Sequence, residues 1–231
     1  DWNNIQVSLG IDFDYYHCHD LLSLDPLASA LFENSSLFSY FAGLVFNNLN
    51  ERSAPTKGMS WAVSYHLYTD NLFQYKDNPI SVFDARWQGC FSPSSKLTVT
   101  PSFYGRVLSG SDNYPFAIIN MVGGTIPGRY MPQQIPFTGI NRAELSQAAL
   151  LVAGLNLRQR ILKNQYISVM GSYGRNSGKF HQILDSSESV DMAGVGIGYM
   201  YKSFLGPVEI QLNWSNQTKK VGWYAGFGFV F

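Results

Sequence analysis

Apolar and polar residues alternate along most of this chain, most clearly in its C-terminal segment Val221–Phe231. Large apolar side chains occupy every second position there, and glycine or tyrosine occupies most of the positions between them. Because successive side chains of a strand point to opposite faces, Trp223, Phe227, Phe229 and Phe231 share one face. A strand with one apolar face and one face of small or polar residues is typical of a barrel whose outside meets lipid.

The same alternation predicts about ten strands. A tilted strand of about 9–11 residues crosses a bilayer, so these segments are long enough for a membrane barrel. The predicted strands are Ile5–Tyr15, Leu37–Asn48, Gly58–Tyr68, Ile80–Phe91, Lys96–Leu108, Leu145–Ile161, Gln165–Gly174, Val190–Tyr201, Val208–Trp214 and Val221–Phe231.

The two faces of the predicted strands differ in chemistry. In most segments the apolar row falls on odd-numbered positions, and in Val208–Trp214 it consists of Val208, Ile210, Leu212 and Trp214. The opposite rows carry polar groups such as Asp84, Arg106 and Glu209, together with many glycines. We therefore expect the apolar rows to face lipid and the polar rows to line the interior. The missing side chains of the interior glycines would leave room for a segment packed inside.

The connections between the predicted strands alternate in length. Long connections are expected at 16–36, 69–79, 109–144 and 175–189, and short turns at 53–57, 92–95, 162–164 and 204–206. Membrane barrels of bacteria have short turns on the periplasmic side and longer loops outside. The chain is therefore predicted to be all-β: a single antiparallel transmembrane β-barrel domain over residues 1–231, located in a bacterial outer membrane.

Composition agrees with this fold and excludes several functions. Charged residues make up 14% of the chain, against about 25% in soluble domains, and no stretch approaches the roughly 20 apolar residues of a spanning helix. The net charge is zero, which gives no reason to expect a nucleic-acid partner. No G-x-S-x-G pattern occurs, so no catalytic residue is assigned, and we expect no metal and no cofactor.

Three motifs resemble the C-terminal barrel of the bacterial surface-antigen superfamily, which contains outer-membrane assembly and two-partner-secretion proteins. Ala54-Pro55-Thr56-Lys57-Gly58 resembles a turn that opens a strand in this family. Gly124–Tyr130, in the longest loop, resembles the loop that folds into the lumen, with Gly124, Gly128, Arg129 and Tyr130 at its motif. Leu205-Gly206-Pro207-Val208 resembles the turn before the penultimate strand.

The resemblance implies a role for several residues. Arg129 would enter the lumen and pair with a carboxylate on the inner wall, with Glu209 as first partner and Asp84 or Glu144 as alternatives. Trp223, Phe227, Phe229 and Phe231 would form the C-terminal signal that the barrel assembly machinery reads. The family barrel has about sixteen strands, so this chain would supply the last ten. The missing N-terminal strands or a periplasmic module would then be partners, together with outer-membrane lipid.

A narrower resemblance concerns the run Gly124 to Gly139, which contains Gln133-Gln134 and Pro136-Phe137. It is similar to barrels fused behind patatin-like phospholipase domains, and implies a barrel that anchors or exports such a module. Two other functions remain open: the barrel of a protein insertase or translocase, and a free-standing ten-stranded pore or adhesin. Pairing of the first strand with the last would favour the free-standing barrel, and unpaired edges would favour missing strands.

Overall fold

The structure is a computed structural model that describes residues 4–16, 35–51, 54–69, 79–111, 114–126, 128 and 131–228. A ten-stranded antiparallel sheet dominates it, with the strand order β1-β2-β3-β4-β5-β9-β10-β11-β12-β13. The strands are β1 (Ile5–Tyr16), β2 (Ser35–Asn47), β3 (Gly58–Thr69), β4 (Ile80–Cys90), β5 (Leu97–Ser109), β9 (Ala149–Leu162), β10 (Gln165–Ser177), β11 (Ser189–Ser203), β12 (Gly206–Ser215) and β13 (Val221–Phe227).

All ten predicted strands are present, and each pairs with its neighbours in sequence order apart from the long insertion between β5 and β9. The strands begin within two residues of their predicted starts, with one exception. The strand predicted at Leu145–Ile161 begins only at Ala149, because Leu145 belongs to a short strand within that insertion. At the C-terminal end, β13 stops at Phe227; Phe229 and Phe231 lie outside the described residues.

The strand registers separate the sheet into one apolar and one polar face. Paired residues of an antiparallel ladder lie on the same face, so a single row can be followed from strand to strand. One row of the outer face contains Val99, Leu157, Val169, Ile197, Leu212 and Trp223. Trp223 is 71% exposed and Leu9 of β1 is 77% exposed, as expected of side chains that meet lipid rather than a protein core.

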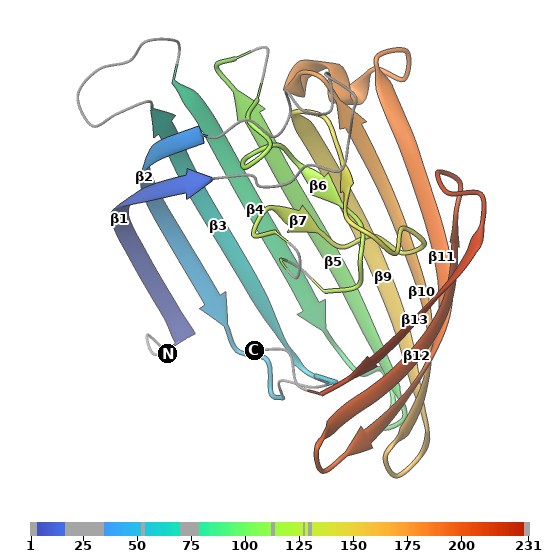
Figure 1. The fold of residues 1–231 in the computed structure, drawn as a ribbon. Coiled ribbons are helices and arrows are strands. Elements are labelled where there is room, and N and C mark those ends of the chain that lie inside the picture. Colours follow the sequence, from blue (N-terminus) through green and yellow to red (C-terminus); the bar gives the residue numbers. More distant parts are fainter. Residues whose placement is uncertain are drawn as a thin grey trace.

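The inner face is covered by the connection between β5 and β9, residues 110–148. Figure 1 shows the main sheet curving around this connection, with β6 (Met121–Val122) and β7 (Gln134–Ile135) on its concave side. A third short strand, β8 (Glu144–Leu145), pairs with β6. The sequence predicted a long loop here; the structure shows a small folded unit inside the sheet.

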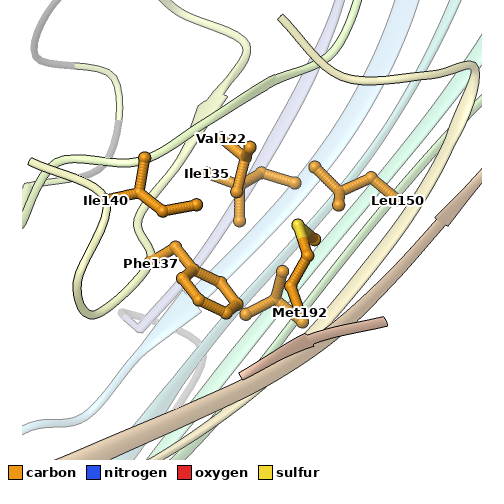
Figure 2. Packing of buried hydrophobic residues seen from close by; sticks show 7 residues of the cluster. Val122, Ile135, Phe137, Ile140, Leu150 and Met192 are labelled. Atoms are coloured by element: carbon orange, nitrogen blue, oxygen red, sulfur yellow. The ribbon is translucent and has the colours of Figure 1, made fainter. Parts of the chain in front are cut away.

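Two apolar clusters attach this unit to the sheet. In the first, shown in Figure 2, Val122, Ile135, Phe137 and Ile140 of the insertion pack with Leu150, Val152 and Met192 of the sheet. In the second, Ala117, Ile118 and Ala148 pack with Leu37, Val82 and Leu108. The chain therefore places its buried apolar core between the insertion and the inner wall, toward the end of the sheet where the long connections lie.

The two outermost strands have free edges. Among the described residues, no strand pairs with the outer edge of β1 or of β13. The only helix described in the connections is the short 3₁₀ helix η2 (Phe180–Leu184) between β10 and β11. No helix in the described part of the chain has the length and apolar character needed to cross a membrane.

The separation of faces is testable on neighbouring residues of β12. Leu212 is 52% exposed on the outer face, whereas Gln211 lies on the inner face and lines a polar cavity. We expect Leu212→Lys to lower the free energy of unfolding in lipid by about 1–4 kcal/mol, because a lysine on the lipid-facing side of a membrane strand is costly. Gln211→Lys, the matched control, should change it by less than about 1 kcal/mol. Urea titration in lipid vesicles measures both, and equal losses would contradict the assignment of faces.

Candidate functional site

The inner-face insertion, residues 110–148, is the candidate functional site, and a buried arginine holds its first segment. Arg106 of β5 faces inward and is 6% exposed. Its Nη1 donates to the carbonyl of Ile118 at 2.8 Å and to Oδ1 of Asn120 at 2.6 Å. A guanidinium has several donors in a fixed plane, so one inward side chain binds two points of the insertion.

Asn120 completes this contact from the side of the insertion. Its side chain is fully buried, and its Nδ2 donates to the carbonyls of Arg106 at 3.3 Å, Gln147 at 2.8 Å and Ala148 at 3.0 Å. The beginning of the insertion and its return to β9 are thereby joined at one amide. Buried polar groups without partners are costly, so these mutual hydrogen bonds favour one position of the insertion in the lumen.

The tip of the insertion packs where the inner wall has no side chains. A Cβ at Gly194 of β11 would overlap the carbonyl of Thr138, and one at Gly222 of β13 would overlap the amide of Asn141. Thr138 Oγ1 lies 2.8 Å from Ser172 Oγ, and Asn213 Nδ2 donates to Asn141 Oδ1 at 2.8 Å. The interior glycines thus accommodate a backbone in close contact, as the sequence suggested for a segment packed inside.

Further hydrogen bonds hold the insertion in its folded shape. Gln134, fully buried, donates from Nε2 to the carbonyl of Gly123 at 2.5 Å, and Gln133 donates to the carbonyl of Ala117 at 3.0 Å. The backbone N–H of Gly124 donates to the carbonyl of Ile140 at 2.6 Å. Phe137, 2% exposed, lies in the apolar cluster of Figure 2. Gln133, Gln134 and Phe137, which belong to the run that resembles the patatin-linked barrels, therefore stabilise the fold of this unit.

Arg129 is the arginine that we predicted from the sequence to enter the lumen. Arg129 and Tyr130 lie outside the described residues, so its pairing with a carboxylate stays a prediction. Gly124 and Gly128 lie in the insertion; the Gly128 N–H donates to the carbonyl of Gln134 at 3.3 Å.

The three proposed carboxylate partners have different surroundings. Asp84 Oδ1 forms an ion pair with Arg86 Nε at 3.0 Å, and Arg86 Nη2 also donates to the carbonyl of Pro132 at 3.2 Å. Glu209 faces the inner cavity and accepts a 3.4 Å hydrogen bond from Gln211 Nε2. Glu144 is exposed on β8. Asp84 therefore contributes to holding the insertion, through Arg86.

Sequence reasoning missed the residues that hold the described insertion, namely Arg86, Arg106 and Asn120. A signal for Arg86 and Arg106 was present, since both are cations in the inward rows of predicted strands. Nothing in the sequence marks Asn120, because its three acceptors come from β5 and from a segment 27 to 28 residues further along the chain.

A polar cavity of about 280 Å³ lies beside the insertion on the inner face. Its lining includes Thr125 and Thr138 of the insertion and, further along the strands, Asn156, Arg158 and Glu209. Hydroxyl and amide groups dominate the polar part of this lining. Within the residues that the structure describes, no group of three His, Cys, Asp or Glu side chains is placed to hold a metal ion; His17, Cys18 and His19 lie outside these residues.

The connection between β10 and β11 is fixed separately, outside the sheet ends. Arg175 Nε pairs with Asp191 Oδ1 at 2.7 Å, and Arg175 Nη1 donates to the carbonyls of Ile183 and Leu184 at 3.2 Å. Asp185 accepts hydrogen bonds from the backbone N–H of Ser187 at 2.9 Å and from its hydroxyl at 2.8 Å, and these lower the pKa of the carboxyl. The connection between β10 and β11 is therefore held by its own side-chain contacts.

The contribution of Asn120 can be measured by removing its amide. Asn120→Ala removes one hydrogen-bond partner from each of three carbonyls and from the Arg106 guanidinium, so we expect a loss of about 1–3 kcal/mol in the stability of the docked insertion. Amide hydrogen exchange of residues 117–148 should accelerate while exchange in β10 and β11 stays unchanged. Unchanged protection of the insertion would show that the amide does not hold it.

The close approach at Gly194 gives a second test with a matched control. Gly194→Ala places a methyl group on the carbonyl of Thr138 and should displace the insertion, which protease cleavage between residues 131 and 145 would report. Gly171→Ala is the control, because the nearest atom to its added Cβ is 3.7 Å away. Equal cleavage of the two variants would contradict packing of the insertion against β11.

Comparison with known proteins supports the reading of the fold. The family model of the OMP85 superfamily matches residues 2–231, which is nearly the whole chain. No curated protein sequence matches the chain. The matched range includes the ten-stranded sheet, its apolar outer face and the folded insertion on its inner face. The chain belongs to the OMP85 superfamily.

Proposed function

We propose that this chain forms the last ten strands of a barrel of about sixteen, which anchors or exports an N-terminal module of the patatin-like phospholipase class. Membership of the OMP85 superfamily supports the general part of this function, an outer-membrane barrel of the assembly and translocation kind. The further parts of the proposal concern the missing strands and the identity of the module.

The free edges of β1 and β13 are the observation that carries the proposal. β1 has twelve residues, and its outer row, Ile5 to Tyr15, is exposed and apolar. A strand with this face lies in lipid, where each backbone N–H or C=O without a partner costs several kcal/mol. Because β1 and β13 do not pair with each other, partner strands from outside the described residues would satisfy both edges.

The packed insertion supports an anchor rather than an open pore. Two apolar clusters and the Arg106–Asn120 contact hold residues 114–148 against the inner wall. Such a unit is pinned at several independent points, so its release requires the loss of several contacts at once. A barrel filled in this way holds an attached module in the membrane without a permanent wide channel.

The patatin class of the module rests on the resemblance of the run Gly124 to Gly139. Three residues of this run stabilise the folded shape of the insertion: Gln133, Gln134 and Phe137. The class of module is thus proposed from sequence likeness, and the catalytic serine and aspartate of such a phospholipase would lie on the module rather than on this barrel.

Two alternative functions predict different native polypeptides. An insertase or translocase would carry periplasmic substrate-binding repeats in place of a phospholipase. A free-standing pore or adhesin would consist of ten strands that close on themselves, with β1 paired to β13.

The experiment is to purify the polypeptide from its native outer membrane, measure its intact mass and treat it with a fluorophosphonate probe for catalytic serines. We expect a mass well above the 25.9 kDa of this chain and labelling on a tryptic peptide outside it. A larger polypeptide without labelling would exclude the phospholipase and favour periplasmic repeats. A polypeptide of 25.9 kDa that is fully folded would overturn the proposal and favour a closed ten-stranded barrel.

A further inference from the structure

The turn between β2 and β3 makes contacts far beyond its own strands. We call its described residues, 48–51 and 54–57, the strap. Arg158 of β9 donates from Nη2 to the carbonyl of Pro55, and Lys202 of β11 forms an ion pair with Glu51. In the sheet order, β9 is three strands from β3 and β11 is five strands from it. A turn that reaches both strands must cross the open side of the curved sheet.

The strap is preorganised by its own side chains. Asn50 Oδ1 accepts hydrogen bonds from the backbone N–H groups of Thr56 at 3.0 Å and Lys57 at 2.9 Å, and its Nδ2 donates to Thr56 Oγ1 at 3.0 Å. Asn48 Oδ1 accepts from the N–H of Met59 at 2.6 Å. Gly58 has φ +108°, a conformation that other residues rarely adopt. These hydrogen bonds hold the described residues of the strap in one conformation.

The strap is also connected to its neighbouring turn. Ser92, in the turn after β4, donates from Oγ to the carbonyl of Thr56 at 3.0 Å. Its contacts thus come from three directions: the turn after β4, the inner wall of β9 and the end of β11. Of these, the Glu51–Lys202 pair is half exposed to solvent, with 44% and 37% of the side chains accessible, and is the contact that solvent and charge can most easily change.

The polar cavity extends from the insertion toward Arg158, the residue that binds the strap. Arg158 lines the cavity and binds the strap, while Thr125 and Thr138 line it from the insertion. Along β9 the cavity lining runs from Val152 near the insertion to Arg158 near the short turns. The insertion thus lines the long-loop end of the cavity, and Arg158 connects its short-turn end to the strap.

We propose that the strap closes the periplasmic end of this cavity and that the Glu51–Lys202 ion pair latches it. The insertion then closes one end of the cavity, and the strap closes the other. Displacement of the insertion alone leaves the lumen closed from the periplasm, and release of the latch opens the cavity to that side. The inference deepens the proposed function, because it rests on a barrel completed by further strands, and it adds a second closure independent of the insertion.

The test measures access to the cavity from the periplasmic side in the full-length protein in native outer membranes. The two cysteines of this chain and any in the rest of the polypeptide are first replaced by serine, and Ser168→Cys then places one thiol in the cavity lining. In spheroplast-derived membranes with the periplasmic face exposed, the rate of reaction with a sulfonated, membrane-impermeant maleimide reports access. Ser95→Cys, in the exposed turn after β4, serves as the reference thiol at the same end.

Reversing the charge of one latch residue should open the strap. We expect Glu51→Lys to accelerate labelling at residue 168 by about fivefold, because an ion pair of roughly 0.5 kcal/mol becomes a repulsion of similar size. The double variant Glu51→Lys with Lys202→Glu should return the rate to that of the unmodified latch. Lys163→Glu, a charge reversal in the turn between β9 and β10, is the control and should leave the rate unchanged.

The outcomes separate this inference from the proposed function. Equal labelling at residue 168 in Glu51→Lys, the double variant and the parent would overturn the latch. A rate that rises equally in Lys163→Glu would also overturn it, since the effect would then be one of general charge. If Glu51→Lys fails to assemble, Glu51→Gln removes the attraction without repulsion and should give a smaller increase. The intact mass of the native polypeptide decides the proposed function separately.

Discussion

The structure depends on one constraint: every backbone and side-chain polar group of the sheet must avoid unpaired contact with lipid. The ladder from β1 to β13 satisfies the backbone groups between strands, and the alternation of side chains sends the polar row inward. The inner face then carries Arg86 and Arg106, which need partners of their own. Asp84 pairs with Arg86 on the same strand, and the insertion supplies both arginines with carbonyl oxygens and Arg106 also with the amide of Asn120. The outer apolar face and the inner folded unit are thus two consequences of the same requirement.

The inner wall is adapted to this unit in shape as well as in charge. Gly194 and Gly222 leave space that Thr138 and Asn141 occupy, and the apolar cluster around Phe137 and Met192 forms where the strands carry larger inward side chains. Charge complementarity and shape complementarity thus act on different parts of the insertion. The Arg106–Asn120 contact fixes its two ends, and the glycine-lined wall of β11 and β13 receives its tip.

The sequence predicted the strands because their signal is local. Period-two alternation over Ile5–Tyr15 or Val190–Tyr201 is visible in the segment itself, and the alternation of long and short connections then gives the topology. The glycines in the inward rows also predicted that a segment packs inside the sheet. The contacts that hold this segment could not be predicted, since Asn120 is joined to Arg106 and Ala148 only after β5 and β9 pair across the insertion. The start predicted at Leu145 was wrong for the same reason. Leu145 belongs to β8, and the pairing of β8 with β6 depends on the fold of the insertion.

The strap, at the other end of the sheet, also makes contacts that could not be predicted from the sequence. Its motif, Pro55 to Gly58, was recognised as a turn, but its reach to Arg158 and Lys202 depends on the curvature of the whole sheet. The two closures that we propose differ in burial: buried contacts fix the insertion, whereas the Glu51–Lys202 pair of the strap is half exposed. Their different exposure implies different ease of release, with the strap as the more readily opened of the two.

The most direct measurement of the central claim is a nitroxide scan along β12 in lipid vesicles, with the full-length protein and one spin label at each position from 208 to 215. The account predicts that collisions with oxygen, which concentrates in the bilayer, peak at positions 208, 210, 212 and 214, where the native outer residues lie. Positions 209, 211 and 213 should instead show low oxygen accessibility. A reversed alternation, or oxygen accessibility that does not alternate along the strand, would contradict the separation of faces on which the fold, the insertion and the strap all depend.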